Sequence, residues 1–130
     1  MSVDLFSPAG ITSWQQRLNS SPSFADAAKA WTGRLLLIET DDDGTDRSTW
    51  VVVDSGRCTE ARNGNPLDED AADYVLAAAP ATWSDLVAAR TTPATAALTG
   101  RLKLRKGNVL SLVPHAKAAA ELLAAAADAA

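Results

Sequence analysis

Two short and nearly unbroken apolar runs constrain the fold of this chain most strongly. They are RLLLIET at residues 34–40 and STWVVVD at residues 48–54. Neither run alternates cleanly between apolar and polar residues, a pattern typical of strands that are buried on both faces. The polar segment DDDGTD between them predicts a turn. The sequence therefore predicts a hairpin of two adjacent buried strands.

The chain before this hairpin is predicted to be helical. Residues 1–11 are expected to form a flexible lead-in, and Ser13 with Gln16 matches a capping box that starts a short helix. Ser21-Pro22 predicts the start of a second helix, because proline at the first helical position loses no hydrogen bond. Since 130 residues suffice for one ordinary domain but not for two, residues 12–130 are expected to form a single domain.

The chain after the hairpin is predicted to add three strands and three helical segments. The strands are expected at residues 57–64, 73–78 and 101–105, the first of them at an edge. Pro80 is predicted to break the alanine-rich stretch that follows residue 78, with a helix restarting at Thr82 and running over residues 83–89. The other two helical segments are expected from Thr92-Pro93 to Gly100 and from Asn108 towards the C-terminus. Together, these elements predict an α/β (α+β) fold.

The charge and the small number of cysteine and histidine residues exclude several classes of function. A net charge of -4 argues against a general nucleic-acid-binding protein, which needs an excess of Lys and Arg. The single cysteine, Cys58, cannot form an internal disulfide, and the single histidine, His115, cannot form a histidine-based metal cluster. Neither end matches a signal peptide or a peroxisomal address, so a cytoplasmic location is expected.

Two candidate reactive sites fail simple tests. The acidic run Asp41–Asp46 suggests a calcium loop, but the twelfth position, which should be a carboxylate, is Trp50. A solvated turn is therefore the favoured interpretation. Cys58 and His115 are the only conventional nucleophile and base, and neither lies in a recognisable catalytic motif. We therefore expect no enzymatic activity and no cofactor.

The stretch GRLKLRKGN places a basic stripe beside two leucines. Arg101, Lys103 and Arg105 alternate with Leu102 and Leu104, and Lys106 completes the basic stripe. One interpretation is the solvent-facing side of an edge strand, where cationic residues deter pairing with other sheets. The other is a surface that meets an anionic head group or a membrane. The first is favoured, and the second stays open.

The second half of the chain resembles the sterol carrier protein 2 (SCP2) lipid-transfer domain. The resemblance is carried by ADYVLAAAPATWSDLVAARTTPATAALTGRLKLRKGNVLSL and, more loosely, by FADAAKAWTGRLLLIE and WVVVDSGRC in the first half. It covers the chain from about residue 12 to the end. The chain departs from the family in its turn LRKGN, which is longer by about one residue, and in lacking the peroxisomal signal of the eukaryotic carriers.

The resemblance implies an SCP2-like fold: a five-stranded, mostly antiparallel mixed sheet with helices packed on it and an apolar tunnel. It implies non-catalytic binding and transfer of a fatty acyl chain, an acyl-CoA or a sterol-like molecule. A transient membrane contact and a homodimer are compatible with it. The alternative is an interaction or dimerisation module with a closed cavity, accessory to a lipid- or steroid-metabolising enzyme.

The expected ligand-lining residues are the large apolar side chains of the strands and of the helices that would cover them. Alanines on the helix faces, among them Ala97 and Ala119, are expected to leave room, and the C-terminal helix is expected to act as a movable lid. The predicted lining set is Trp31, Leu36, Ile38, Val51, Val53, Trp83, Leu86, Leu98, Leu102, Leu104, Leu110, Val113 and Leu123.

Overall fold

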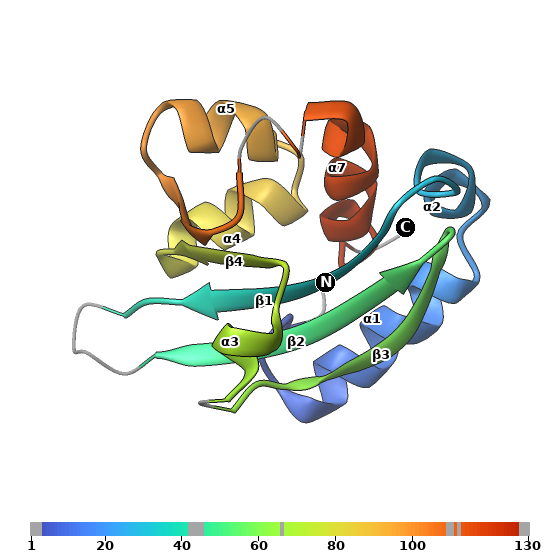
Figure 1. Cartoon of the computed structure of the whole chain (residues 1–130), viewed down its shortest axis with the longest axis horizontal. Coiled ribbons are helices and arrows are strands. Elements are labelled where there is room, and N and C mark those ends of the chain that lie inside the picture. Colours follow the sequence, from blue (N-terminus) through green and yellow to red (C-terminus); the bar gives the residue numbers. More distant parts are fainter. Residues whose placement is uncertain (1–3, 42–45, 66, 109–110, 112, 128–130) are drawn as a thin grey trace.

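A five-stranded mixed sheet forms the frame of the molecule (Figure 1). The structure is a computed structural model that describes residues 4–41, 46–65, 67–108, 111 and 113–127. The strand order is β3-β2-β1-β4-β5. Only the β1–β4 pair is parallel; the other three pairs are antiparallel. The mostly antiparallel mixed sheet is therefore confirmed. The strands are β1 (Thr32–Glu39), β2 (Arg47–Asp54), β3 (Arg57–Asn63), β4 (Tyr74–Ala78) and β5 (Leu102–Lys106).

The two apolar runs form the predicted hairpin. They become β1 and β2, which pair antiparallel with Leu35 opposite Val51 and Leu36 opposite Trp50. The acidic turn between them falls partly on residues 42–45, which lie outside the described residues. The edge-like third strand is confirmed as β3, and the stripe-bearing strand β5 forms the other edge of the sheet.

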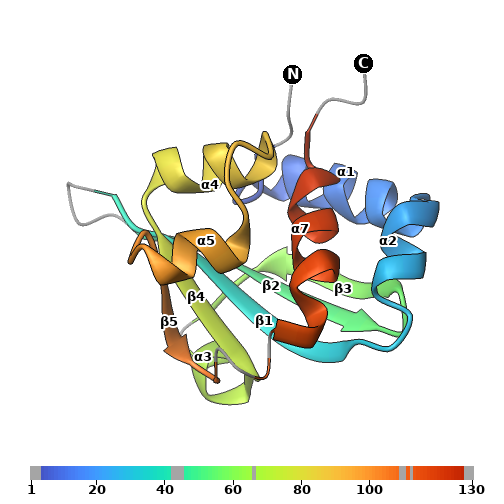
Figure 2. The same ribbon diagram turned by 90° about the horizontal axis from the view of Figure 1, so that it is seen from above.

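In the part of the chain that the structure describes, five α-helices form a layer on one face of the sheet, as the view from above shows (Figure 2). A short 3₁₀ helix, η1 (Val113–His115), leads into the last of them. The very short helix α3 (Asp68–Ala71) packs on the opposite face, within a segment predicted to be a loop. The five helices are α1 (Pro8–Asn19), α2 (Pro22–Ala27), α4 (Pro80–Val87), α5 (Pro93–Leu98) and α7 (Ala116–Ala124).

The predicted start of the first helix was wrong. The helix α1 begins at Pro8, where Ser7 is the N-cap and its hydroxyl accepts a hydrogen bond from the Gly10 N–H at 3.1 Å. Ser13, the predicted cap, lies in the middle of this helix. A Cβ on Gly10 would collide with the carbonyl oxygen of Asp4, so glycine permits the preceding chain to fold back closely. The predicted domain start at residue 12 therefore falls inside α1.

Proline begins four of the helices in this structure. Pro8, Pro22, Pro80 and Pro93 are the first residues of α1, α2, α4 and α5. Pro80 does separate β4 from α4, but the helix starts at that proline rather than at Thr82, which is buried within it. Proline suits this position because the missing N–H would have no partner there.

The sheet separates two apolar clusters. Alternate residues of β1 point to opposite faces, so Leu35 and Leu37 belong to the large cluster under the helices. Leu36 and Ile38 belong to a smaller cluster on the other face. Gly64 covers this smaller cluster so closely that an added Cβ would lie 2.8 Å from the Leu36 side chain.

A polar network completes the cover of the smaller cluster. The Arg62 guanidinium lies 5.2 Å from the ring centre of Trp50 and donates to both carboxylate oxygens of Asp68 at 2.9 and 3.0 Å. The Asp68 carboxylate also accepts the N–H of Asn65 at 2.7 Å. The hydrogen bond from Arg62 is the main reason that the pKa of Asp68 lies below its usual value. This network holds α3 on the sheet.

Within the described residues, no helix has the length and apolar character needed to cross a bilayer.

Candidate ligand-binding cavity

An apolar cavity of about 120 Å³ lies between the sheet and the helical layer. Its floor is formed by alternate residues of three neighbouring strands, namely Leu35, Leu37, Leu76, Leu102 and Leu104. Its walls and roof come from the helices and the segments next to them, namely Trp31, Trp83, Pro93, Ala94, Ala97, Val113, Ala116, Ala119, Leu122 and Leu123. Ala94 and Val113 are exposed, so this end of the cavity reaches the surface. We call this space the apolar cavity.

Six of the predicted lining residues border the apolar cavity: Trp31, Trp83, Leu102, Leu104, Val113 and Leu123. The alanines Ala97 and Ala119 also border it, as the small-residue argument predicted. These residues come from five separate parts of the chain, which the fold brings together around one space.

Leu36 and Ile38 are placed on the wrong side of the sheet by the prediction. Both are buried in the smaller cluster on the face opposite the cavity, beside Trp50 and Val75. Their neighbours Leu35 and Leu37 occupy the expected positions instead. Because β1 is apolar on both faces, its sequence does not alternate between apolar and polar residues. The sequence therefore cannot show which face lies under the helices.

The other predicted residues do not line the apolar cavity. Val51, Val53 and Leu86 are buried in the large cluster away from it. Leu98 points outwards and is 84% exposed. Leu110 lies outside the described residues.

Two tryptophans are held in place at the cavity wall. The indole N–H of Trp83 donates to the backbone oxygen of Ile38 at 3.0 Å, which satisfies its polar atom within the core. The ring of Trp31 stacks on the His115 ring with centres 5.5 Å apart and planes at 13°. His115 therefore packs against the wall of the cavity through its ring.

The helix α7 is tied to α1 near its C-terminal end. The indole N–H of Trp14 donates to the backbone oxygen of Leu122 at 2.8 Å, and Arg17 donates to the backbone oxygen of Ala127 at 2.6 Å. Carbonyls in the last turn of a helix lack intrahelical partners, so Trp14 satisfies an oxygen that α7 leaves open, while Arg17 holds the chain just after the helix. At the other end of α7, its first residue Ala116 and the preceding Val113 of η1 border the cavity.

Cys58, the candidate nucleophile, is buried and held in place by its neighbours. Cys58 is buried on β3, and this burial raises the pKa of its thiol to about 11. Its backbone is held by the Asn19 side chain, which accepts from the Cys58 N–H at 2.9 Å. No group of three or more potential metal-ligating side chains occurs in the part of the chain that the structure describes.

The basic stripe is only partly neutralised. Arg101 donates to the Asp85 carboxylate at 2.6 Å, which with Arg90 lowers the pKa of Asp85. Lys106 donates to the backbone oxygens of Glu69 and Asp70. Lys103 and Arg105 are exposed on the edge strand β5. The stripe is thus the solvent-facing side of the strand whose leucines line the apolar cavity.

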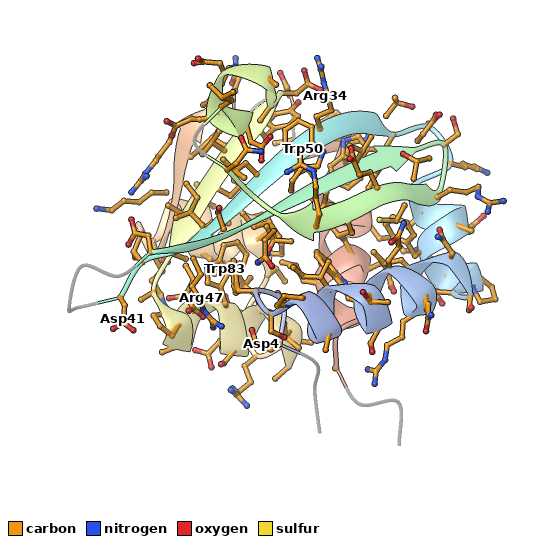
Figure 3. The ribbon with its side chains drawn as sticks, turned by 90° about the horizontal axis from the view of Figure 1, so that it is seen from below. Asp4, Arg34, Asp41, Arg47, Trp50 and Trp83 are labelled. Carbon is orange, nitrogen blue, oxygen red and sulfur yellow. The ribbon has the colours of Figure 1, made fainter. Side chains whose placement is uncertain are left out.

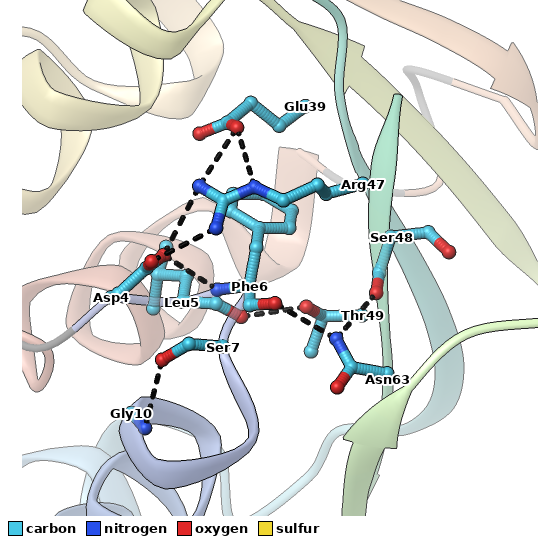
Figure 4. A network of polar contacts seen from close by, with 10 residues as sticks. All are labelled: Asp4, Leu5, Phe6, Ser7, Gly10, Glu39, Arg47, Ser48, Thr49 and Asn63. Atoms are coloured by element: carbon cyan, nitrogen blue, oxygen red, sulfur yellow. Dashed lines mark hydrogen bonds and ion pairs between the residues drawn. The ribbon is translucent and has the colours of Figure 1, made fainter. Parts of the chain in front are cut away.

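A second pocket, which is more open to solvent and which we call the polar cavity, has a volume of about 290 Å³. It is lined by Asp4, Leu5, Phe6, Glu39, Arg47, Pro80, Trp83, Ser84 and Val87. Trp83, Arg47 and Asp4 all border it and lie in one region of the molecule (Figure 3). The guanidinium of Arg47 bridges Asp4 and Glu39 and lies 5.5 Å from the ring centre of Phe6 (Figure 4). The hydrogen bond with Asp4 is the largest cause of the raised pKa of Arg47. Glu39 and Arg47 lie opposite each other in the β1–β2 hairpin, whereas Asp4 comes from a distant segment, so the sequence alone does not bring the three together.

Comparisons with known proteins agree with this architecture. The model of the SCP-2 sterol transfer family matches residues 11–112. A crystal structure of sterol carrier protein 2 is 31% identical, with a TM-score of 0.85 over 98% of this chain and 100% of that one. The solution structure of a conserved hypothetical protein from Thermus thermophilus is also 31% identical, with a TM-score of 0.80 over 95% of this chain and 88% of that one.

A more distant structure shares the fold alone. Apo sterol carrier protein 2 from Yarrowia lipolytica is 22% identical, with a TM-score of 0.64 over 95% of this chain and 98% of that one. The comparison with curated proteins gives no match.

Proposed function

The chain belongs to the SCP-2 sterol transfer family, and from this premise we propose that it binds a single lipid in the apolar cavity and passes it to a membrane. The ligand class is a long alkyl chain or a sterol-like molecule. The observation that carries the proposal is the cavity itself, whose lining is almost entirely apolar and comes from three strands and four helical segments. No chemical step is part of the proposal.

The hydrophobic effect suffices for such binding. Each buried methylene contributes about 0.8 kcal/mol, so an alkyl chain of about sixteen carbons offers on the order of 12 kcal/mol. Association costs roughly 4 to 15 kcal/mol. A micromolar or tighter dissociation constant is therefore within reach without a charged anchor.

Binding of a whole chain requires the cavity to grow. Its volume of about 120 Å³ is below the roughly 300–1,000 Å³ typical of small-molecule pockets. Because Trp14 and Arg17 tie down the C-terminal end of α7, we assign the opening movement to its other end, around Val113 and Ala116. The C-terminal lid of the sequence-based hypothesis thus becomes a lid hinged near its own C-terminus.

The membrane-facing surface is proposed to surround the cavity mouth. Val113 borders the mouth and is 61% exposed, and Leu98 on the neighbouring helix α5 is 84% exposed. Lys103 and Arg105 lie on the strand that contributes Leu102 and Leu104 to the cavity floor. The apolar side chains surround the mouth, while the two cations lie along the β5 edge and point away from the cavity, so a bilayer would meet the cations only where it also reaches this edge.

Two further parts of the proposal concern the setting of the protein. We propose a cytoplasmic location, in keeping with a lone cysteine that is buried. The alternative, an interaction module, requires a closed cavity, and the open apolar cavity does not support it. Dimerisation through Leu98 and Val113 is nevertheless compatible with carrying a ligand. Light scattering across a concentration series distinguishes a monomer from a dimer.

Native mass spectrometry tests the proposal. Protein purified without detergent or organic solvent is expected to carry one lipid per chain. After delipidation it is expected to bind fluorescent fatty acids or sterols with micromolar affinity. A delipidated protein that binds neither class of probe at high micromolar concentration would contradict the proposal.

A further inference from the structure

The apolar and polar cavities share one wall. Trp83 is the only residue that lines both of them within the described part of the chain. Its ring is held by the hydrogen bond to Ile38 and by an edge contact with Phe6, whose ring centre lies 5.7 Å away. Trp83 therefore lies between the two spaces. Together their volumes reach the range of about 300–1,000 Å³ that ligand pockets occupy.

Each nitrogen of the guanidinium in the polar cavity already faces a carboxylate. The Arg47 side chain donates to Glu39 from Nε at 2.9 Å and to Asp4 from Nη1 at 3.0 Å, and its Nη2 lies 2.8 Å from Glu39 Oε1 and 3.4 Å from Asp4 Oδ1. The carboxylate atom Glu39 Oε2 accepts no hydrogen bond from the described residues. A carboxylate oxygen at this pocket can therefore accept an O–H or N–H from a ligand.

The net charge of the polar cavity also disfavours a ligand with an anionic head. Two carboxylates, on Asp4 and Glu39, face one guanidinium, on Arg47, which leaves a formal charge of about -1 at neutral pH. A ligand carboxylate or phosphate placed there would meet two like charges and a guanidinium whose charge is already paired with both carboxylates. A hydroxyl or an amine would meet neither obstacle.

We propose that the apolar and polar cavities are the tail end and the head end of one binding site, with Trp83 as the movable partition. The site prefers a long-chain or sterol-like ligand whose head is a hydrogen-bond donor, a hydroxyl or an amine, over one with an anionic head. This inference rests on the proposed function, because it presupposes that the apolar cavity binds the tail.

Competition between matched ligands tests the inference. Hexadecanol, hexadecylamine and hexadecanoate, which differ only in the head, displace a pyrene-labelled alkyl chain from delipidated protein. Hexadecanol and hexadecylamine are expected to bind at least about tenfold more tightly than hexadecanoate. Glu39→Gln, which removes the charge and keeps the shape, is expected to reduce that ratio by about threefold or more. Glu69→Gln, at an exposed residue of α3 that lines neither cavity, is the control and should leave the ratio unchanged.

A second variant obstructs the head end directly. Ser84 is exposed on α4 and borders only the polar cavity, so Ser84→Trp is expected to preserve the fold and to bring the ratio towards one. Equal affinities for the three heads in the wild-type protein, or a ratio unaffected by both variants, would overturn the inference while the proposed function stands. Failure of every ligand to displace the alkyl probe would instead overturn the proposed function.

Discussion

The tryptophans show how single side chains define this molecule. Trp14 donates to the backbone of α7, Trp50 donates to the Glu60 carboxylate at 2.8 Å, and Trp83 donates to the backbone of β1. Each indole thus buries a large apolar ring and still satisfies its N–H, the combination that allows tryptophan in a core. Two of the four tryptophans, Trp31 and Trp83, border the apolar cavity.

At the same scale, we predict that Cys58 is unreactive in the folded protein. Burial raises the pKa of its thiol to about 11, so the reactive thiolate is scarce in mildly alkaline buffer. Alkylation followed by mass spectrometry is expected to be slow in native protein and fast after addition of denaturant. Equal rates in the two conditions would show that the thiol is accessible and that the β3 edge opens readily.

Single residues also mark the limit of sequence-based prediction. The types of residue around the cavity were predictable, because Leu102 and Leu104 alternate with cations that must face water. In β1 the same reasoning has no basis, since Leu35, Leu36, Leu37 and Ile38 are all apolar. The pairing of Leu35 with Val51 sets the face, and this register depends on contacts across the sheet rather than on local sequence.

At the scale of elements, α3 is the piece that local sequence identifies least well. It has four residues, three of them acidic, and no side-chain cap. Its place depends on the ion pair between Asp68 and Arg62, which also covers Trp50. The face of the sheet that lacks the five helices is therefore protected by a polar clamp over a small apolar cluster.

We predict that Asp68→Asn destabilises the protein by about 1–2 kcal/mol, since it weakens charge-assisted hydrogen bonds whose arginine partner is partly exposed. Because the pKa of Asp68 is lowered on folding, its stabilising contribution is present above the unfolded pKa of about 4 and is lost as the pH falls through the folded value. Urea denaturation of wild type and variant measures both effects, and the two midpoints should converge in acid.

Asp70→Asn is the matched control for this prediction. Asp70 lies on the same short helix and its side chain is exposed, so the substitution has the same effect on the helix charge without breaking the clamp. Its urea midpoint is expected to stay close to that of the wild type. An equal loss in both variants would mean that the charge at the start of α3, rather than the pair with Arg62, stabilises this element.

The helix boundaries show why element prediction succeeded in type and failed in position. Ser7-Pro8 and the capping box at Ser13 both fulfil the requirements for a helix start. The earlier start prevails because Leu5 and Phe6 are buried only when the chain folds back before α1. Rules based on local sequence do not include this stabilisation by tertiary packing. In contrast, the succession of strands and of most helices along the chain was predictable from the turns and prolines.

At the scale of the whole molecule, net charge and local charge have different consequences. The chain carries a net charge of -4, yet the β5 edge of the sheet presents Lys103 and Arg105 to solvent. A cation near an anionic bilayer contributes about 1 kcal/mol, and that contribution falls within a Debye length. A protein that is acidic overall can therefore approach an anionic membrane in one orientation.

We predict that Lys103→Gln with Arg105→Gln slows ligand transfer to anionic vesicles by roughly ten- to thirtyfold at low salt, as the loss of two such cations implies. Arg57→Gln, on the opposite edge strand β3, should have little effect. Transfer rates follow from the fluorescence of a pyrene-labelled lipid. If the transfer rate of the double variant falls by the same factor with uncharged vesicles, the effect does not arise from membrane charge.

The central claim is that the space between sheet and helices holds an alkyl chain, and two neighbouring alanines of α7 test it most directly. Ala119 lines the apolar cavity and Ala120 does not, so Ala119→Phe fills the space while Ala120→Phe adds the same ring elsewhere on the helix. The measurement is the dissociation constant of a pyrene-labelled alkyl chain for each variant. We expect Ala119→Phe to weaken binding by about tenfold or more and Ala120→Phe to change it by less than about twofold. Equal affinities in the two variants would place the bound chain outside this cavity and contradict the account.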